Sequence, residues 1–154
     1  MIISFAGHAS LGNSRGVKEA VKEQIRKYAV RESMVCYLGG YGEFDEICAL
    51  ACQELKKEYN KIEVVYVSPY IGLCGQKAKC GLYDATLYPP IENTPPKFAI
   101  SRRNEWMMAH ADLVIAYVIR NYGGAYRSLQ AAKRRKKQII NIGRSIDSYG
   151  KLSD

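Results

Sequence analysis

Four short segments of this sequence have the composition of loops that contact a small, charged ligand: residues 7–16, 39–46, 101–104 and 121–128. Phosphate is bound by free backbone amides at the start of a helix, where the helix dipole also attracts negative charge. Glycine at such a place lets the backbone approach the ligand closely, whereas an acidic side chain opposes phosphate. The four segments differ in their acids, so we expect different chemistry from each.

The first and fourth segments contain no acid and are the best candidates for phosphate. Residues 7–16 read Gly-His-Ala-Ser-Leu-Gly-Asn-Ser-Arg-Gly, although Ser14 also suits the N-cap of an ordinary helix. Residues 121–128 read Asn-Tyr-Gly-Gly-Ala-Tyr-Arg-Ser, and the two tyrosines suit base stacking or simple packing equally well. The predicted ligand contacts of these segments are Gly7, His8, Ser10, Asn13, Ser14, Tyr122, Gly123, Gly124, Tyr126 and Arg127.

The second segment, Gly-Gly-Tyr-Gly-Glu-Phe-Asp-Glu at residues 39–46, places three carboxylates in the first turn of a helix. Carboxylates there oppose phosphate but suit ribose hydroxyls or acid–base chemistry, and for Glu43 simple compensation of the helix dipole is favoured. Asp45 and Glu46 are therefore candidate catalytic residues. The candidate ligand contacts in the turn before them are Gly39, Gly40, Tyr41 and Gly42.

The third segment begins with Ser101, which can cap a helix, and continues with Arg102 and Arg103. Two cations at the positive end of a helix cost stability unless an anion lies nearby or the side chains are simply solvated. We predict that Arg102, Arg103 and Asn104 contact the ligand.

Five apolar runs rich in β-branched residues are expected to be the strands that position these loops, and four amphipathic stretches between them are expected to be helices. The strands are predicted at 2–6, 34–38, 62–67, 113–117 and 138–142, and the helices after residue 15 and at about 44–59, 102–110 and 125–136. This alternation predicts an α/β fold, a Rossmann-like three-layer sandwich with a mostly parallel five-stranded sheet in the order 3-2-1-4-5. Ligands then bind where the strand order reverses, between the first and fourth strands.

The 154 residues, 47% of them hydrophobic, predict one globular domain over residues 1–142 and a C-terminal tail at 143–154. Residues 68–97 are the exception, because this connection carries all five prolines and is far longer than an ordinary loop. Such a segment suits a lid, an interface arm or a local insertion.

The cysteine pattern and the lack of a leader or a long apolar run favour a reducing cytoplasm and exclude a membrane span. The five cysteines contain no C-x-x-C pair. A zinc site would need Cys48, Cys52, Cys74 and Cys80, but we expect buried or idle thiols, no metal and no cofactor.

The formal net charge of +8 indicates an acidic partner. The basic run at 133–137 is interpreted as the solvated end of the last helix, and nucleic acid is the less favoured reading. His8 and His110 show no spacing typical of a hydrolytic triad.

Taken together, these motifs resemble the SLOG superfamily, which joins the LOG phosphoribohydrolases to the Smf/DprA proteins. The resemblance covers nearly the whole chain and is strongest to small bacterial members of poorly defined function. It implies a Rossmann-like fold, a nucleotide-type ligand and a homodimer. The residues that carry it are Phe5 to His8, Leu38 to Gly42, Arg102 to Met107, Ala111 to Ala116 and Gly123 to Tyr126.

The same resemblance argues against catalysis. Gln130 stands where LOG enzymes have their catalytic glutamate, and Arg127 stands where the related deoxyribosyltransferases have a nucleophilic carboxylate. Glu46 ends a G-G-x-G-x-x-x-E pattern, but after the second strand, a different place in the fold. We therefore predict a nucleotide-binding protein that senses or sequesters its ligand, with an N-glycosidic bond hydrolase and a single-stranded DNA-binding module as alternatives.

Overall fold

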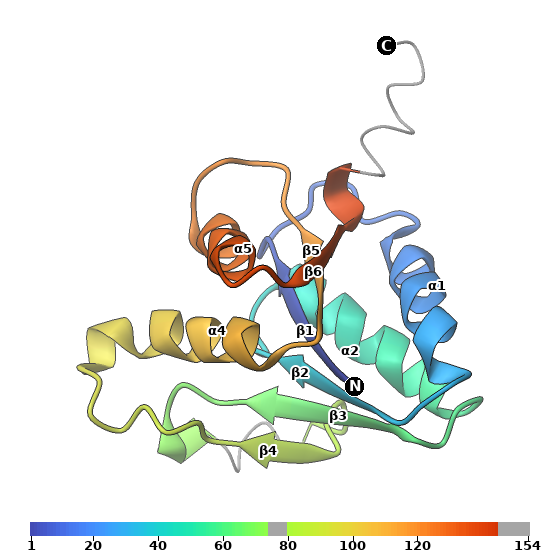
Figure 1. Ribbon diagram of the computed structural model, residues 1–154, viewed down its shortest axis with the longest axis horizontal. Coiled ribbons are helices and arrows are strands. Elements are labelled where there is room, and N and C mark those ends of the chain that lie inside the picture. The colour runs from blue at the N-terminus through green and yellow to red at the C-terminus, as the bar shows by residue number, and fades with distance from the viewer. Residues whose placement is uncertain (74–79, 145–154) are drawn as a thin grey trace.

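The computed structural model describes residues 1–73 and 80–144, which form an all-parallel sheet between two layers of helices (Figure 1). The sheet has six strands in the order β4-β3-β2-β1-β5-β6. The strands are β1 (Ile2–Gly7), β2 (Met34–Leu38), β3 (Ile62–Val67), β4 (Ala85–Leu87), β5 (Leu113–Tyr117) and β6 (Gln138–Asn141). The helices are α1 (Val17–Ala29), α2 (Glu43–Lys56), α4 (Ala99–His110) and α5 (Gly124–Arg134), with short 3-10 turns η1 (Ile71–Leu73) and η2 (Pro96–Phe98). The predicted fold class is confirmed, and the five predicted strands lie in the predicted order.

Two apolar cores hold the helices against the two faces of the sheet. One is formed with α1 and α2 and includes Ile25, Phe44 and Leu55. The other is formed with α4 and α5 and includes Met107 and Ala131. Every residue of β5 is buried because this strand is covered on both faces, which explains its unbroken apolar run.

The long connection at 68–97 is not a structureless loop, because it contributes the sixth strand, β4, to the sheet edge. Asp84 directly precedes this strand and anchors it: its backbone amide donates to the Val64 carbonyl at 2.7 Å, and its carboxylate accepts from the Val64 amide at 2.8 Å. Lys56 holds the same carboxylate at 2.7 Å. A predicted loop is therefore partly an edge strand, with a 3-10 turn on either side.

Helix α4 starts earlier than predicted. Pro96 begins the turn η2, which leads directly into α4 at Ala99, with Phe98 at the N-cap position. Proline suits the first turn of a helix because its φ is already helical and it lacks the amide that would be unpaired there. The prediction that Ser101 caps this helix is therefore wrong, and Arg102 is the fourth residue of α4 instead of the first.

Two further findings bear on the class of protein. Among the described residues, no helix is long and apolar enough to cross a membrane, and no group of three metal-binding side chains gathers. Cys48 and Cys52 are buried in the core and Cys80 is exposed, whereas Cys74 lies outside the described residues. Residues 145–154 of the expected tail also lie outside them.

Candidate functional site

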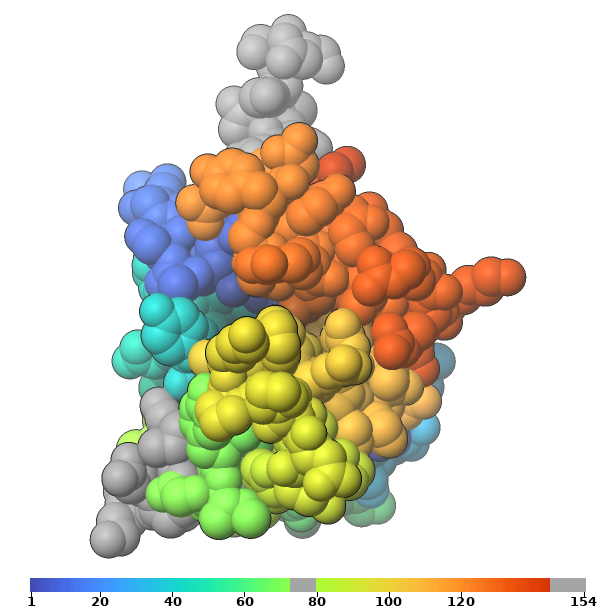
Figure 2. All heavy atoms as spheres, turned by 90° about the vertical axis from the view of Figure 1, so that its left-hand side faces the viewer, coloured from blue at the N-terminus to red at the C-terminus, as the bar shows by residue number. Residues whose placement is uncertain are grey.

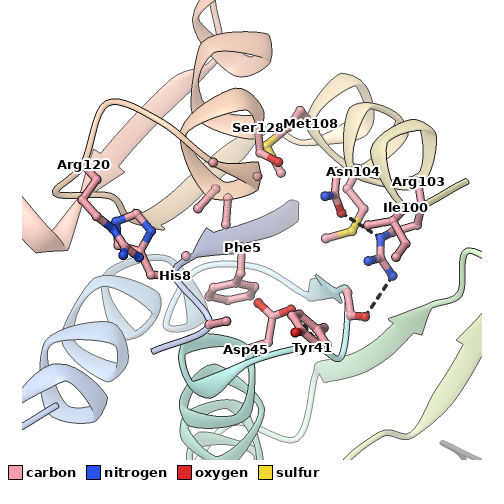
Figure 3. Close-up of a pocket in the computed structure, with 18 of the residues that line it drawn as sticks. Phe5, His8, Tyr41, Asp45, Ile100, Arg103, Asn104, Met108, Arg120 and Ser128 are labelled. Carbon is pink, nitrogen blue, oxygen red and sulfur yellow. Dashed lines mark hydrogen bonds between the residues drawn. The ribbon is translucent and has the colours of Figure 1, made fainter. Parts of the chain in front are cut away.

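A cavity of about 340 Å³ lies at the reversal of strand order, where the carboxyl ends of β1, β2 and β5 meet the starts of α4 and α5. Figure 2 faces this side of the molecule, where the segments after β1, after β2 and after β5 gather around the start of α4. In the close-up of Figure 3, Asp45 and Tyr41 lie on one wall, Arg103 and Asn104 on a second, and His8 beside Arg120 on a third.

Just over half of the predicted site residues are in the lining of this cavity. They are Gly7, His8, Gly39, Tyr41, Asp45, Arg103, Asn104, Tyr122, Gly123 and Gly124. Four segments far apart in the sequence are thus brought together, as the topology requires, since the carboxyl ends of parallel strands share one edge.

The other predicted residues lie outside the cavity. The segment after Ala9 turns away toward the exposed start of α1, whose N-cap is Gly16 and has no side-chain cap. Glu46 is exposed and lines a separate hollow beside Tyr83. The predicted residues that do not line the cavity are Ser10, Asn13, Ser14, Gly40, Gly42, Glu46, Arg102, Tyr126 and Arg127.

The sequence reasoning missed nine lining residues. Four of them, Phe5, Ala6, Met107 and Met108, are apolar core residues that also line the cavity, and the sequence pattern marks these only as core. Arg120 is different, because it follows the carboxyl end of β5 and directly precedes the segment at 121–128, a position that could have drawn attention to it. The missed residues are Phe5, Ala6, Ala9, Ile100, Met107, Met108, Arg120, Ala125 and Ser128.

The start of α5 opens onto the cavity without an acid in its first turn and without a side-chain cap. Its N-cap, Gly123, has a φ of 91°, a conformation that favours glycine. The first amides of a helix have no partner within the helix, and they carry the positive end of its dipole. A Cβ atom built on Gly124 meets nothing within 4 Å, so open space lies against this helix start.

His8 is a buried side chain on the cavity wall. Its Nε2 accepts a hydrogen bond from the Ile119 amide at 3.0 Å, which leaves the ring proton on Nδ1 as a donor. Burial, and then the nearby Arg120 guanidinium, lower the pKa of His8. The ring is therefore held neutral, in one tautomer, at physiological pH.

Asp45 supplies a buried carboxylate to the opposite wall. Burial raises the pKa of Asp45 to about 6, against the opposing effects of backbone hydrogen bonds from the Gly39–Tyr41 turn and of the Arg103 charge. The Tyr41 amide donates to Oδ2 at 3.3 Å. A carboxyl group with such a pKa can accept from a hydroxyl or exchange a proton near neutral pH.

Arg103 is 4% exposed and ties three elements together, whereas Arg102 is 61% exposed in its side chain. Arg103 Nη1 donates to the Gly39 carbonyl at 2.9 Å and to the Val67 carbonyl at 2.8 Å, and Nε donates to Asn104 Oδ1 at 2.8 Å. Burial lowers the pKa of Arg103, and the Asp45 charge opposes this. The interpretation of Arg103 as a solvated cation at a helix start is wrong, because it braces the ends of β2 and β3.

The chain matches no protein-family model and no curated protein, but its fold is similar to several solved structures. DNA processing protein A from Helicobacter pylori, described for its single-stranded DNA binding mode, has a TM-score of 0.61 at 18% identity over 90% of this chain. DNA processing protein A from Streptococcus pneumoniae has a TM-score of 0.62 at 16% identity over 89% of this chain. The Moco carrier protein of Chlamydomonas rheinhardtii has a TM-score of 0.54 at 11% identity over 99% of this chain.

These comparisons show a shared Rossmann-like fold. The present chain spans 63% of the H. pylori structure, 48% of the S. pneumoniae structure and 83% of the Moco carrier. Proteins of one fold carry out many different functions, so the chemistry has to be argued from the cavity itself.

Proposed function

We propose that the cavity binds a phosphorylated nucleotide or nucleotide-derived small molecule, and that the protein senses or sequesters this ligand. The observation that carries the proposal is the start of α5, which has no acid in its first turn and faces the cavity next to Arg120. Backbone amides, a helix dipole and a guanidinium together form a site for a phosphate group.

The remaining walls suit the rest of a nucleotide. His8 presents an N–H donor, and Asp45 and Asn104 present oxygens that accept from ribose hydroxyls. Tyr41 and Tyr122 stand at the mouth with 76% and 64% of their surface exposed, where an aromatic ring can stack on a base. The similarity of fold to a protein named as a Moco carrier supports a sequestering role.

The SLOG assignment belongs to this proposal and is supported by the similarity of fold to the two DNA processing proteins. On the same resemblance we propose a homodimer, and from the cysteine pattern we propose a location in the cytoplasm. Sedimentation of the purified protein tests the dimer.

The test of the main proposal is thermal stabilisation by a panel of nucleoside mono- and diphosphates, together with mass spectrometry of small molecules that copurify. We expect at least one nucleotide to stabilise the wild type. Gly124→Asp places a carboxylate at the phosphate position, in open space, and is expected to lower affinity on the order of a hundredfold. Gly124→Asn, of the same shape but neutral, serves as the control. Equal stabilisation of all three proteins would refute this placement.

The second candidate function is hydrolysis of an N-glycosidic bond, and the observation that favours it is Asp45, a cavity carboxyl group with a pKa of about 6. We expect no rapid release of free base from nucleoside monophosphates, because Gln130 and Arg127 replace the carboxylates of the related enzymes. Saturable release that is lost in Asp45→Asn and kept in Glu46→Gln would establish this second function. Loss in Glu46→Gln alone would contradict the placement of the chemistry in the cavity.

A further inference from the structure

The excess of positive over negative charge in this protein is confined to one part of the chain. Residues 113–144, which run from β5 through α5 and β6, contain eight of the 23 lysines and arginines and none of the 15 acids. The rest of the chain has fifteen of each sign and is balanced. The whole net charge of +8 therefore lies in the segment that contains α5, the helix at whose start the phosphate is proposed to bind.

Part of this charge lines a second hollow that adjoins the cavity. The hollow has a volume of about 470 Å³, and we call it the basic hollow. It lies along the flank of α5 and is lined by Arg120, Tyr122, Tyr126, Lys133 and Arg144 together with neutral residues, with no acid among them. Arg120 and Tyr122 line both spaces, so the basic hollow and the cavity meet at these two side chains.

The segment that carries Arg120 is fixed in place before any ligand arrives. The Asn141 side chain accepts from the Val118 amide at 3.1 Å and donates to the Val118 carbonyl at 2.9 Å. The next amide, of Ile119, donates to His8. A Cβ on Gly143 would come within 2.9 Å of Ile119, so a glycine lets the chain after β6 close against this segment. Rigid support of this kind reduces the entropy that binding must overcome.

The arrangement fits a second anionic group beside the first. Arg120, with its guanidinium 5.5 Å from the Tyr122 ring centre, lines the cavity at the start of α5 and also the basic hollow, which Lys133 lines from the last turn of the same helix. Neither Arg120 nor Lys133 has an acidic partner within 4.0 Å among the described residues. Two tyrosine rings beside the cations offer surfaces on which a base can stack.

We propose that the basic hollow binds a second phosphoryl group of the ligand in the cavity, so that the ligand is a nucleotide with two separate phosphoryl groups, such as a 5′-phosphorylated dinucleotide. This inference rests on the proposed function of the cavity. It narrows the ligand class from any nucleotide to one whose two phosphoryl groups lie in the cavity and in the basic hollow, with Arg120 between these two spaces.

The experiment compares the affinities of three probes by calorimetry: a nucleoside 5′-monophosphate, the 5′-phosphorylated dinucleotide and a ten-residue oligonucleotide, each made with the four RNA bases. We expect the dinucleotide to bind the wild type about tenfold more tightly than the monophosphate, because charged hydrogen bonds to the second phosphate are added. Lys133→Gln is expected to remove most of this gain and to leave the monophosphate within about twofold of its wild-type affinity.

Lys136→Gln is the matched control, since it removes the same charge from an exposed residue that does not line the basic hollow. Equal affinities of dinucleotide and monophosphate, or equal losses in Lys133→Gln and Lys136→Gln, would overturn the inference while leaving the proposed function intact. Absence of binding by every probe would overturn both. A further gain of more than tenfold for the oligonucleotide, falling steeply with salt, would instead identify a single-stranded nucleic acid as the occupant.

Discussion

Helices α2 and α5 begin with the same backbone geometry and contribute to the same cavity, yet they offer it opposite charges. Gly42 before α2 has φ 92° and ψ 171°, and Gly123 before α5 has φ 91° and ψ −179°. Neither glycine can supply a side-chain cap, so both helices start with amides that need partners from elsewhere.

The two helices obtain these partners differently. At α2, the Glu43 amide donates to the Ala9 carbonyl at 2.9 Å, and the Glu43 carboxylate accepts from the Leu11 amide at 3.1 Å. At α5, the first turn has no acid, and Arg120 lies nearby on the cavity wall. The first amide of α2 is thus paired within the protein, whereas the start of α5 faces the cavity without a side-chain cap. Side chains around the glycine turn, more than the turn itself, decide which helix start is an anion site.

The largest effect is expected from Arg103→Gln, which tests whether the start of α2 belongs to a braced structural unit. The change removes the donors to the Gly39 and Val67 carbonyls in a buried setting, so the unliganded protein should lose about 3–5 kcal/mol of unfolding free energy. Urea unfolding measures this loss. Arg102→Gln, at an exposed position one residue away, should change stability by less than about 0.5 kcal/mol. Similar small losses in both variants would reassign Arg103 to ligand binding alone.

A smaller effect, dependent on pH, is expected from Asp45→Asn. The native state holds the pKa of Asp45 at about 6, above its ordinary value of 3.8, so between these values it binds the proton more strongly than the unfolded state. Wild-type stability should fall by up to about 3 kcal/mol relative to the variant as pH rises from about 4 to about 6, and the difference should stay constant above that. Thermal unfolding of both proteins across this range tests the sign. A stability difference between the two proteins that does not change with pH would mean that burial does not raise the pKa of Asp45.

The smallest effect, about 1 kcal/mol of lost stability, is expected from Glu43→Gln, which weakens the hydrogen bond from Leu11 and removes a charge that complements the dipole of α2. The variant should not gain phosphate affinity, because the Glu43 amide already donates to Ala9. Glu19→Gln removes the first-turn acid of α1, an exposed side chain 3.8 Å from Lys22, and is the control for loss of an acid at a helix start. If phosphate stabilised Glu43→Gln, the acidic side chain alone would be what prevents phosphate binding at the start of α2.

Strand positions were predictable because a parallel sheet covered on both faces needs runs that are mostly apolar, and even Ile62–Val67 carries only Glu63 as a charged residue. Met34–Leu38, Ile62–Val67 and Leu113–Tyr117 were predicted at their observed bounds for this reason. Ala85–Leu87 was missed, because three residues in a proline-rich segment give no periodicity and their position depends on a distant partner, Val64.

The location of the site could be predicted from the sequence, but many of the residues that line it could not. The topology alone places the loops after β1, β2 and β5 together, and Gly7, Gly39 and Gly124 all line the cavity. The role of Arg103 could not be derived, because its partners are backbone carbonyls of two other strands. Whether a side chain points into a cavity or away from it is decided by the helix start and the register, which vary by a residue or two in any sequence-based prediction.

The two edge strands of the sheet affect how two copies of the chain can associate. Its outermost strands are its two shortest, β4 with three residues and β6 with four. Exposed strand edges act as templates on which another molecule adds a strand, and short, charged edges discourage this. The basic run at 133–137 ends directly before Gln138, the first residue of β6, so a second copy seeking that edge would meet concentrated like charge. Besides lining the basic hollow through Lys133, this run therefore opposes edge-to-edge association at β6, an effect that requires no nucleic acid.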